Sequence, residues 1–375
     1  MRATRLSVAL AARGHDVTVA TYHLGTAELD NSDPPIDLQR IANLELYSNT
    51  QAGPTIVKLT ILDFMLFAKV RRLLRNSPFD LIYAHHYESL AIALAARFAT
   101  RKTSVPIVYD AHTMLENELP HYAWKPLRGL FRKLGGFVDK YLPKRANQIV
   151  AVSQTISNQL CRYNVPTKIE VVTNRVETHH FCASQWDAKS LEAQTILFSG
   201  NMAPYQGIEL LLHCVAMLAP ELPKLRLRIL SDESFAPYAS MAESLGIADI
   251  IHCVNADFQE LPAHLAAASV AINPRCEGDG IAQKLLNYMA VGIPIVSSAG
   301  TAVGLRHNAN ALVVENENPT AMADAIRTLL SDPDLATRLG GKAREQILAN
   351  GGWMDAAKEV EASTFSQLYP SASEH

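Results

Sequence analysis

Short apolar strands alternate with helices along nearly the whole chain, and this alternation restricts its fold more than any other feature. A helix over Leu6 to Gly14 is followed by a strand over Asp16 to Thr21, and two further strands, Leu81 to Ala84 and Pro106 to Tyr109, flank a helix over Leu90 to Thr100. Such short apolar runs are typical of strands that are buried on both faces. Strands joined through helices pair in parallel, so the pattern predicts parallel sheets covered by helices.

A polar stretch without strand character, from Thr178 to Gln194, separates two runs of this pattern. A chain of 375 residues is long enough for two domains. We therefore expect a first domain over residues 1–185, a second over 186–352, and a terminal helix over 353–375 that packs back on the first. In doubly wound domains of this kind ligands bind in loops at the carboxyl ends of the strands, so functional residues are expected there.

Composition and charge exclude several classes of protein. Hydrophobic residues make up 48% and charged residues 19% of the chain, which is ordinary for a globular protein and excludes a disordered or fibrous one. The net charge of -3 favours no nucleic-acid partner. The five cysteines form no CxxC pair and no zinc-binding spacing, so we expect reduced cysteines and no structural metal. No signal-peptide pattern follows Met1 and no apolar run is long enough to span a membrane, so we expect a cytoplasmic protein.

Five segments of the chain, in order, resemble the family 4 retaining glycosyltransferases. They are LAARGHDVTV (10–19), IVAVSQTISNQL (149–160), VVTNRVETHHF (171–181), ILFSGNMAPYQGIELLL (196–212) and NPRCEGDGIAQKLLNYMAVGIPIVSS (273–298). The resemblance implies the GT-B fold: two Rossmann-like domains with doubly wound parallel sheets, facing each other across a cleft, and a C-terminal crossover helix. It also implies a hexosyltransferase that moves a sugar from a nucleotide-diphosphate-sugar donor to a glycan or lipid-linked acceptor, with no cofactor and no metal.

A loop with two glycines, Gly278 and Gly280, precedes a helix of the second domain. Glycines at such a place let backbone N–H groups approach a phosphate, and the helix dipole adds to the attraction. A tight turn would need the same residues. Arg275 and Lys284 lie on either side of the loop and can stabilise the charge that builds on a leaving diphosphate. The alternatives are an ion pair of Arg275 with Glu277 and a solvated helix face for Lys284.

The resemblance assigns roles to further residues of this domain, and the chain departs from the family's pattern at several of them. The family has a glutamate that contacts the transferred sugar where this chain has Asp279, with Glu277 as the alternative, and a glutamate that binds the ribose where this chain has Asn287. Asn201 and Gln206 replace the Arg and Lys that usually hold the diphosphate, and the two nearby cations would compensate. The expected donor-binding residues are Gly200, Asn201, Gln206, Arg275, Gly278, Gly280, Lys284, Leu285 and Asn287, and the expected catalytic residues are His112, Asp279, Glu277 and Lys284.

His112 follows the strand over Pro106 to Tyr109, near its carboxyl end. The resemblance implies that a histidine at this place hydrogen-bonds a hydroxyl of the donor sugar or the reaction centre, whereas a lone histidine is otherwise more often structural. Asp110, Glu116 and Glu118 lie in the same segment. Contact with the acceptor and helix capping explain these three acids equally well.

A basic and aromatic segment runs from Trp124 to Arg145. It has seven Lys and Arg residues against one acid, Asp139, and apolar residues are interleaved with them. Such a segment suits peripheral contact with an anionic membrane at its inner face, where a lipid-linked acceptor would lie. A helix pair that packs on the sheet with a solvated basic face is the alternative.

The resemblance places a strand and a glycine-rich loop ahead of the helix at Leu6, and we expect them upstream of Met1, or else an impaired enzyme. Two other functions stay open. Another GT-B sugar-nucleotide enzyme, such as an epimerase, would act on the donor without an acceptor. A non-catalytic nucleotide-sugar-binding or scaffold protein is favoured by the neutral residues Asn201, Gln206 and Asn287.

Overall fold

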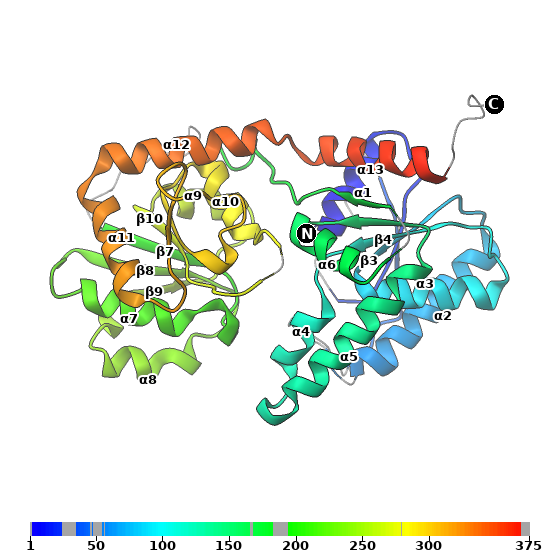
Figure 1. The fold of residues 1–375 in the computed structure, drawn as a ribbon, viewed down its shortest axis with the longest axis horizontal. Coiled ribbons are helices and arrows are strands. Elements are labelled where there is room, and N and C mark those ends of the chain that lie inside the picture. The colour runs from blue at the N-terminus through cyan, green and yellow to red at the C-terminus, as the bar shows by residue number, and fades with distance from the viewer. Residues whose placement is uncertain are drawn as a thin grey trace. The chain divides into compact units, whose positions relative to one another are not determined.

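The computed structural model describes residues 2–24, 35–45, 47, 55, 57–165, 168–182, 194–278 and 280–368 (Figure 1). Contacts within the chain divide it into two compact units. The first comprises Met1–Asn174 and Trp353–His375, and the second comprises Arg175–Gly352. Both units are built from parallel strands and helices, which confirms the expected α/β class. Among the described residues, no helix is both long enough and apolar enough to cross a membrane.

The first unit contains two parallel sheets. One pairs β1 (Thr18–Thr21) with β2 (Asp37–Arg40), and the other contains, in chain order, β3 (Ile82–His85), β4 (Ile107–Ala111), β5 (Gln148–Ala151) and β6 (Ile169–Val171). Every residue of β4 and β5 is buried, as in central strands covered on both faces. The sequence pattern does not predict β2, because its residues DLQR lack the apolar character that marks a strand.

The two sheets of the first unit are separate. In the described residues no ladder joins β1 to β3: β1 pairs with β2 and β3 pairs with β4. Within the described part of the chain, β1 and β3 therefore each have one edge whose backbone N–H and C=O groups pair with no other strand. This is the unit in which the family resemblance places one more central strand.

The helices of the first unit include one from the far end of the chain. They are α1 (Arg2–Ala12), the π-helix η2 (Lys58–Leu62), α2 (Asp63–Asn76), α3 (His86–Thr100), α4 (Leu115–Tyr122), η3 (Lys125–Leu127), α5 (Arg128–Tyr141), η4 (Pro143–Arg145), α6 (Gln154–Arg162) and α13 (Trp353–Leu368). The Ser153 hydroxyl caps α6 by accepting a hydrogen bond from the Ile156 N–H at 3.2 Å. α13 buries Trp353 and Ala357 in one core with Leu6 of α1.

The second unit has one six-stranded parallel sheet in the order β12-β11-β10-β7-β8-β9. Its strands are β7 (Gln194–Ser199), β8 (Leu225–Leu230), β9 (Ile251–Val254), β10 (Val270–Asn273), β11 (Ile295–Ser298) and β12 (Leu312–Val314). Its helices are η6 (Pro204–Gln206), α7 (Ile208–Leu218), α8 (Ala236–Ser244), η7 (Ala248–Ile250), α9 (Leu261–Ala266), α10 (Gln283–Val291), η8 (Ala299–Thr301), α11 (Pro319–Ser331) and α12 (Pro333–Ala349). The chain runs from β7 outward to β9 and then returns to β10 on the other side of β7, so the strand order reverses between β7 and β10. Ligands bind at such a reversal in doubly wound sheets.

The division between the units lies between residues 174 and 175, ahead of the expected boundary at 185 and 186. Residues 175–182 belong to the second unit because Val176 and Phe181 are buried in its core beside Tyr288. His180 adds a contact of 2.8 Å between its Nε2 and the Phe258 carbonyl, and the two rings stack at 4.4 Å. Val176 and Phe181 are surrounded in the sequence by polar residues, and for this reason the stretch resembles a linker in the sequence.

Candidate functional site

Two loops meet at the carboxyl ends of β7 and β10. Gly207 determines how closely they approach, because it has a φ of +78° and a Cβ added there would lie 2.5 Å from the Pro274 carbonyl oxygen. Only glycine suits both this left-handed backbone and this contact. The loop after β7, which carries the expected donor-binding residue Gln206, is therefore held against the loop after β10, which carries Arg275.

Lys284, in the first turn of α10, is a buried cation that is 9% exposed. Its Nζ donates a hydrogen bond to Gln206 Oε1 at 2.8 Å and lies 4.3 Å from the centre of the Phe198 ring. Burial, and then the charge of Arg275, lower the pKa of Lys284 to about 7. No carboxylate of the described residues forms an ion pair with this ammonium. The alternative of a solvated helix face for Lys284 is therefore wrong.

The N-terminus of α10 lies beside this ammonium. Ala282 precedes the helix and has no side chain that can cap it, and uncapped N–H groups at the start of a helix can bind an anion. The expected donor-binding residue Leu285 differs from its neighbours. Its side chain is fully buried in the core and its N–H donates to the Ala282 carbonyl at 2.9 Å, so it offers no group to a ligand in this structure.

Arg275 is the second cation of the site. Its guanidinium lies 5.0 Å from the centre of the Tyr205 ring, and its Nε donates to the Glu277 carbonyl oxygen at 2.5 Å. The described residues show no ion pair between Arg275 and the exposed Glu277 carboxylate, so the guanidinium charge stays available. A Cβ added to Gly278 would lie 2.7 Å from Arg275 Nη2, so the guanidinium packs directly over the backbone of this glycine. The expected catalytic residue Asp279 lies outside the described residues, and Gly280 follows it.

The two neutral replacements of the first donor loop form a network. Asn201, just after Gly200, accepts a hydrogen bond from Gln206 Nε2 at 3.0 Å and donates one to the Tyr205 hydroxyl at 3.0 Å. These bonds orient the Gln206 amide so that its oxygen faces the Lys284 ammonium. The third replacement, Asn287, is buried one turn along α10 and contacts Gln283 Nε2 at 3.4 Å.

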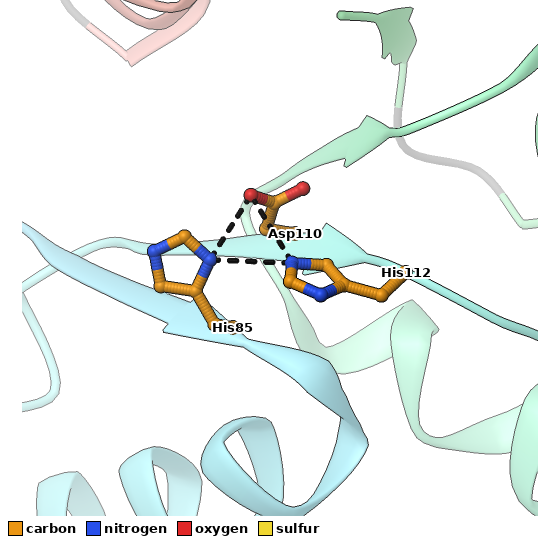
Figure 2. A group of neighbouring side chains, drawn as sticks. All are labelled: His85, Asp110 and His112. Carbon is orange, nitrogen blue, oxygen red and sulfur yellow. Dashed lines mark hydrogen bonds and ion pairs between the residues drawn. The ribbon is translucent and has the colours of Figure 1, made fainter. Parts of the chain in front are cut away.

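A second cluster of polar side chains lies at the carboxyl ends of β3 and β4 in the first unit (Figure 2). Asp110 Oδ2 is 3.1 Å from His85 Nδ1 and 3.5 Å from Nε2 of His112, and these two ring nitrogens are 3.3 Å apart. The structure thus brings the expected catalytic residue His112 together with His85, which sequence reasoning did not select. The signal that identified His112, a position at the carboxyl end of a buried strand, applies to His85 as well.

Asp110 is fully buried and its charge is balanced by Arg2, whose Nε donates to Asp110 Oδ2 at 2.8 Å. Burial opposes ionisation of Asp110, but the charge of Arg2 outweighs it and holds the pKa of Asp110 well below its usual range. Burial lowers the pKa of His112, against the attraction of Asp110, so this ring is neutral at neutral pH. The three ligand atoms could hold a metal ion. However, Arg2 already occupies the carboxylate oxygen that both histidines face.

His86, the next residue along the chain, belongs to a different group of charges. Its Nδ1 is 2.5 Å from Glu88 Oε2 and its Nε2 is 3.5 Å from Glu118 Oε2. These two carboxylates overcome the effect of burial and raise the pKa of His86 to about 9. Its backbone has a φ of +72°, an uncommon conformation for a residue other than glycine. An imidazolium that is charged at neutral pH therefore lies beside the neutral His112, with the ring centres 6.0 Å apart.

The acids of the α4 segment are not its helix caps, which corrects the capping alternative. The N–H groups of Leu115 and Glu116 donate instead to the two carboxylate oxygens of Asp139, at 3.1 and 2.9 Å. Glu116 accepts a hydrogen bond from the Tyr163 hydroxyl, and Glu118 faces His86. Asp139, the one acid of the basic segment, thus ties α5 to the start of α4.

The outer face of α5 and the turn before it are both apolar and basic. The most exposed apolar side chains are Trp124 at 76%, Leu130 at 63% and Phe137 at 61%. The same segment carries six exposed cations, namely Lys125, Arg128, Arg132, Lys133, Lys140 and Arg145. These apolar side chains stay largely exposed, which the alternative of a helix pair with a solvated basic face does not explain.

Comparison with known proteins yields consistent matches over most of the chain. Residues 1–180 match the family described as Glycosyltransferase Family 4, and residues 193–332 match the family described as Glycosyl transferases group 1. The D-inositol 3-phosphate glycosyltransferase of Streptomyces scabiei is 26% identical over 313 residues, which cover 77% of this chain and 69% of that protein. The MMP alpha-(1->4)-mannosyltransferase of Mycolicibacterium hassiacum is 27% identical, covering 95% of this chain and 92% of that protein. The fold is similar to that of Anabaena HepE, solved in complex with UDP and glucose, with a TM-score of 0.75, 17% identity, and coverage of 97% of this chain and 95% of that one.

Proposed function

The chain is a family 4 glycosyltransferase of GT-B fold, and from this premise we propose that it transfers a sugar from a nucleotide-diphosphate-sugar to a glycan or lipid-linked acceptor, with retention of the anomeric configuration. One observation carries the choice of donor. The Lys284 ammonium is buried without a carboxylate partner among the described residues, beside a second cation and an open helix N-terminus. A diphosphate would supply the negative charge that balances these two cations.

In the proposed reaction the second unit stabilises the leaving diphosphate. Lys284 and Arg275 face the negative charge that builds as the bond to the anomeric carbon breaks, and the first N–H groups of α10 add to the effect. Gln206 holds the Lys284 ammonium in place. Asn287 would bind the ribose, and Glu277 or Asp279 would contact the transferred sugar. These groups supply the charge stabilisation without a metal ion.

In the first unit we assign His112 to the sugar. Because its imidazole is neutral, it can exchange hydrogen bonds with hydroxyl groups without opposing charge on the reacting carbon. The acceptor proton would pass to the leaving phosphate, as the family's retaining mechanism implies, so no protein base is needed. The low pKa of Asp110 and the high pKa of His86 leave neither group suited to take that proton.

Replacement of Lys284 by Met tests this proposal. Lys284→Met should lower sugar transfer by about 100-fold or more, the usual effect of removing one donor that faces developing charge. It should not lower the free energy of unfolding, because the buried ammonium has no carboxylate to lose among the described residues. Lys342→Met, at an exposed lysine of α12, is the matched control and should change neither quantity.

The assay also separates the alternatives. Sugar transfer is measured with a panel of nucleotide-sugars beginning with UDP-glucose, with and without acceptors. Turnover of Lys284→Met close to that of the unchanged chain contradicts the proposed diphosphate site. Donor turnover without any acceptor would indicate an epimerase or hydrolase, and donor binding without bond cleavage would indicate a scaffold.

We further propose that residues 124–145 contact an anionic membrane surface. Trp124, Leu130 and Phe137 would enter the interface, while the surrounding cations pair with lipid headgroups. This contact would place the enzyme at the inner face of the membrane, beside a lipid-linked acceptor.

Vesicle flotation tests the membrane contact. The unchanged chain should bind vesicles that contain phosphatidylglycerol and should bind purely zwitterionic vesicles weakly. Leu130→Ser combined with Phe137→Ser should abolish binding, whereas Phe98→Ser should not, because Phe98 is 82% exposed but lies on α3. Equal binding by both variants would refute the assignment of this face.

A further inference from the structure

The histidine pair of the first unit contains a proton whose position the geometry determines. His85 Nδ1 and His112 Nε2 face each other at 3.3 Å, so one of the two nitrogens donates and the other accepts. The Asp110 carboxylate, which is ionised, lies 3.1 Å from the first nitrogen and 3.5 Å from the second. The carboxylate attracts a proton and repels a lone pair. The proton therefore belongs on the nearer nitrogen, Nδ1 of His85.

This assignment has a consequence for His112. Its Nε2 must then accept a hydrogen bond, and because the ring is neutral its single proton is on Nδ1. Figure 2 shows Nδ1 of His112 on the side of the ring that points away from His85 and Asp110. Among the described residues Nδ1 of His112 has no hydrogen-bond partner, and the side chain is 28% exposed. It can therefore donate to a ligand.

We propose that His85, oriented by Asp110, fixes His112 in the Nδ1–H tautomer, so that His112 serves as a hydrogen-bond donor to an oxygen of the sugar. His85 is on this view a positioning residue of the transfer reaction. The inference rests on the proposed function, because it names the direction of the hydrogen bond at a site assigned there.

The charges around the pair support a neutral His112. Arg2 lies against the same carboxylate oxygen at 2.8 Å, and its positive charge disfavours a second cation there. His86, which Glu88 and Glu118 keep in its charged form, lies beside the His112 ring, with the ring centres 6.0 Å apart. Asp110 favours a charged His112, and burial together with the charge of Arg2 outweighs it.

Nuclear magnetic resonance of the full chain, labelled with ¹⁵N-histidine, reads the tautomer directly. A spectrum of His112→Asn identifies the signals of His112 by their loss. In the unchanged chain His112 should show a protonated Nδ1 and an unprotonated Nε2. His85→Leu removes the donor, so the proton should move to Nε2 and face Asp110. His85→Asn should retain the original tautomer, because its side-chain amide N–H can replace the Nδ1–H of His85.

Kinetic measurements provide the second readout. His85→Leu should lower kcat by about tenfold, the effect of one misdirected hydrogen bond, and His85→Asn should restore most of it. The proposal is refuted by an Nε2–H tautomer in the unchanged chain, by an unaltered tautomer in His85→Leu, or by an unaltered kcat when the tautomer changes. Absence of any sugar transfer by the unchanged chain would instead contradict the proposed function, while the tautomer spectra could still be read.

Discussion

In the folded protein without a bound anion, burial disfavours the charged form of the Lys284 side chain. Its ammonium loses a proton near pH 7 in the folded state, against an ordinary value of 10.5. Between these values the unfolded chain binds more protons than the folded one. The unfavourable contribution of Lys284 to stability is therefore present in full below about pH 7 and fades as the pH rises towards 10.5.

A bound diphosphate should reverse this shift, because its negative charge stabilises the ammonium. Donor binding should then take up a proton above about pH 7, and the affinity should fall by up to about tenfold for each further pH unit. Calorimetric titration of the bound nucleotide-sugar, in buffers of different ionisation enthalpy, measures both quantities. Lys284→Met should bind more weakly and lose the dependence. An affinity of the unchanged chain that stays constant above neutrality would contradict a proton-linked site.

At the scale of elements, the hairpin of α4 and α5 has one side that packs closely and one side that stays open. A Cβ added at Gly135 would lie 2.3 Å from the Leu115 carbonyl oxygen, so the two helices touch through their backbones there. Asp139, one turn further along α5, satisfies the first N–H groups of α4. The exposed apolar residues of α5 therefore lie on a helix whose opposite side is held firmly against α4.

Two glycines of the same helix allow a matched test of this packing. Gly135→Ala should lower the free energy of unfolding by about 1–3 kcal/mol, because the helices must separate to admit the methyl group. Gly129→Ala, where a Cβ would meet nothing within 4 Å, should raise it by about 0.5–1 kcal/mol through better helix propensity. Denaturant unfolding measures both. Equal effects at the two positions would show that the hairpin does not pack as described.

At the scale of the whole molecule, the two ends of the chain complete one unit. α13 buries Ala356, Ala357 and Val360 against a core that includes Leu6 and Val150. Glu361 of the same helix forms an ion pair with Arg13. The stability of the first unit therefore depends on residues near the C-terminal end of the chain.

A charge at a buried position of α13 should therefore destabilise the first unit. Ala357→Asp introduces an unpaired charge at a position with no exposure and should destabilise the first unit by about 3 kcal/mol or more. Ala362→Asp, on the exposed side of the same helix, should have almost no effect. Hydrogen exchange resolved by segment measures the two units separately. Loss of protection in the second unit of Ala357→Asp, with the first unit unaffected, would contradict this assignment.

The sequence by itself determined the α/β class, the order of most strands and helices, and the loops that carry the candidate functional residues. It could do so because helices and buried strands impose a local spacing on apolar residues, and because ligands of doubly wound sheets bind after strands. Arg275, Lys284 and His112 were placed in this way, whereas Gln206 came from the resemblance to the family.

Only the tertiary structure decided how those residues are arranged and what they contact. That Lys284 is buried against Gln206, that His85 and Arg2 share the carboxylate of Asp110, and that Asp139 caps α4 are contacts between residues far apart in the chain. Residues 175–182 likewise joined the second unit because of where Phe181 is buried. Local spacing carries no information about such contacts, since they depend on which side chains the strand order and the helix packing bring within hydrogen-bond distance.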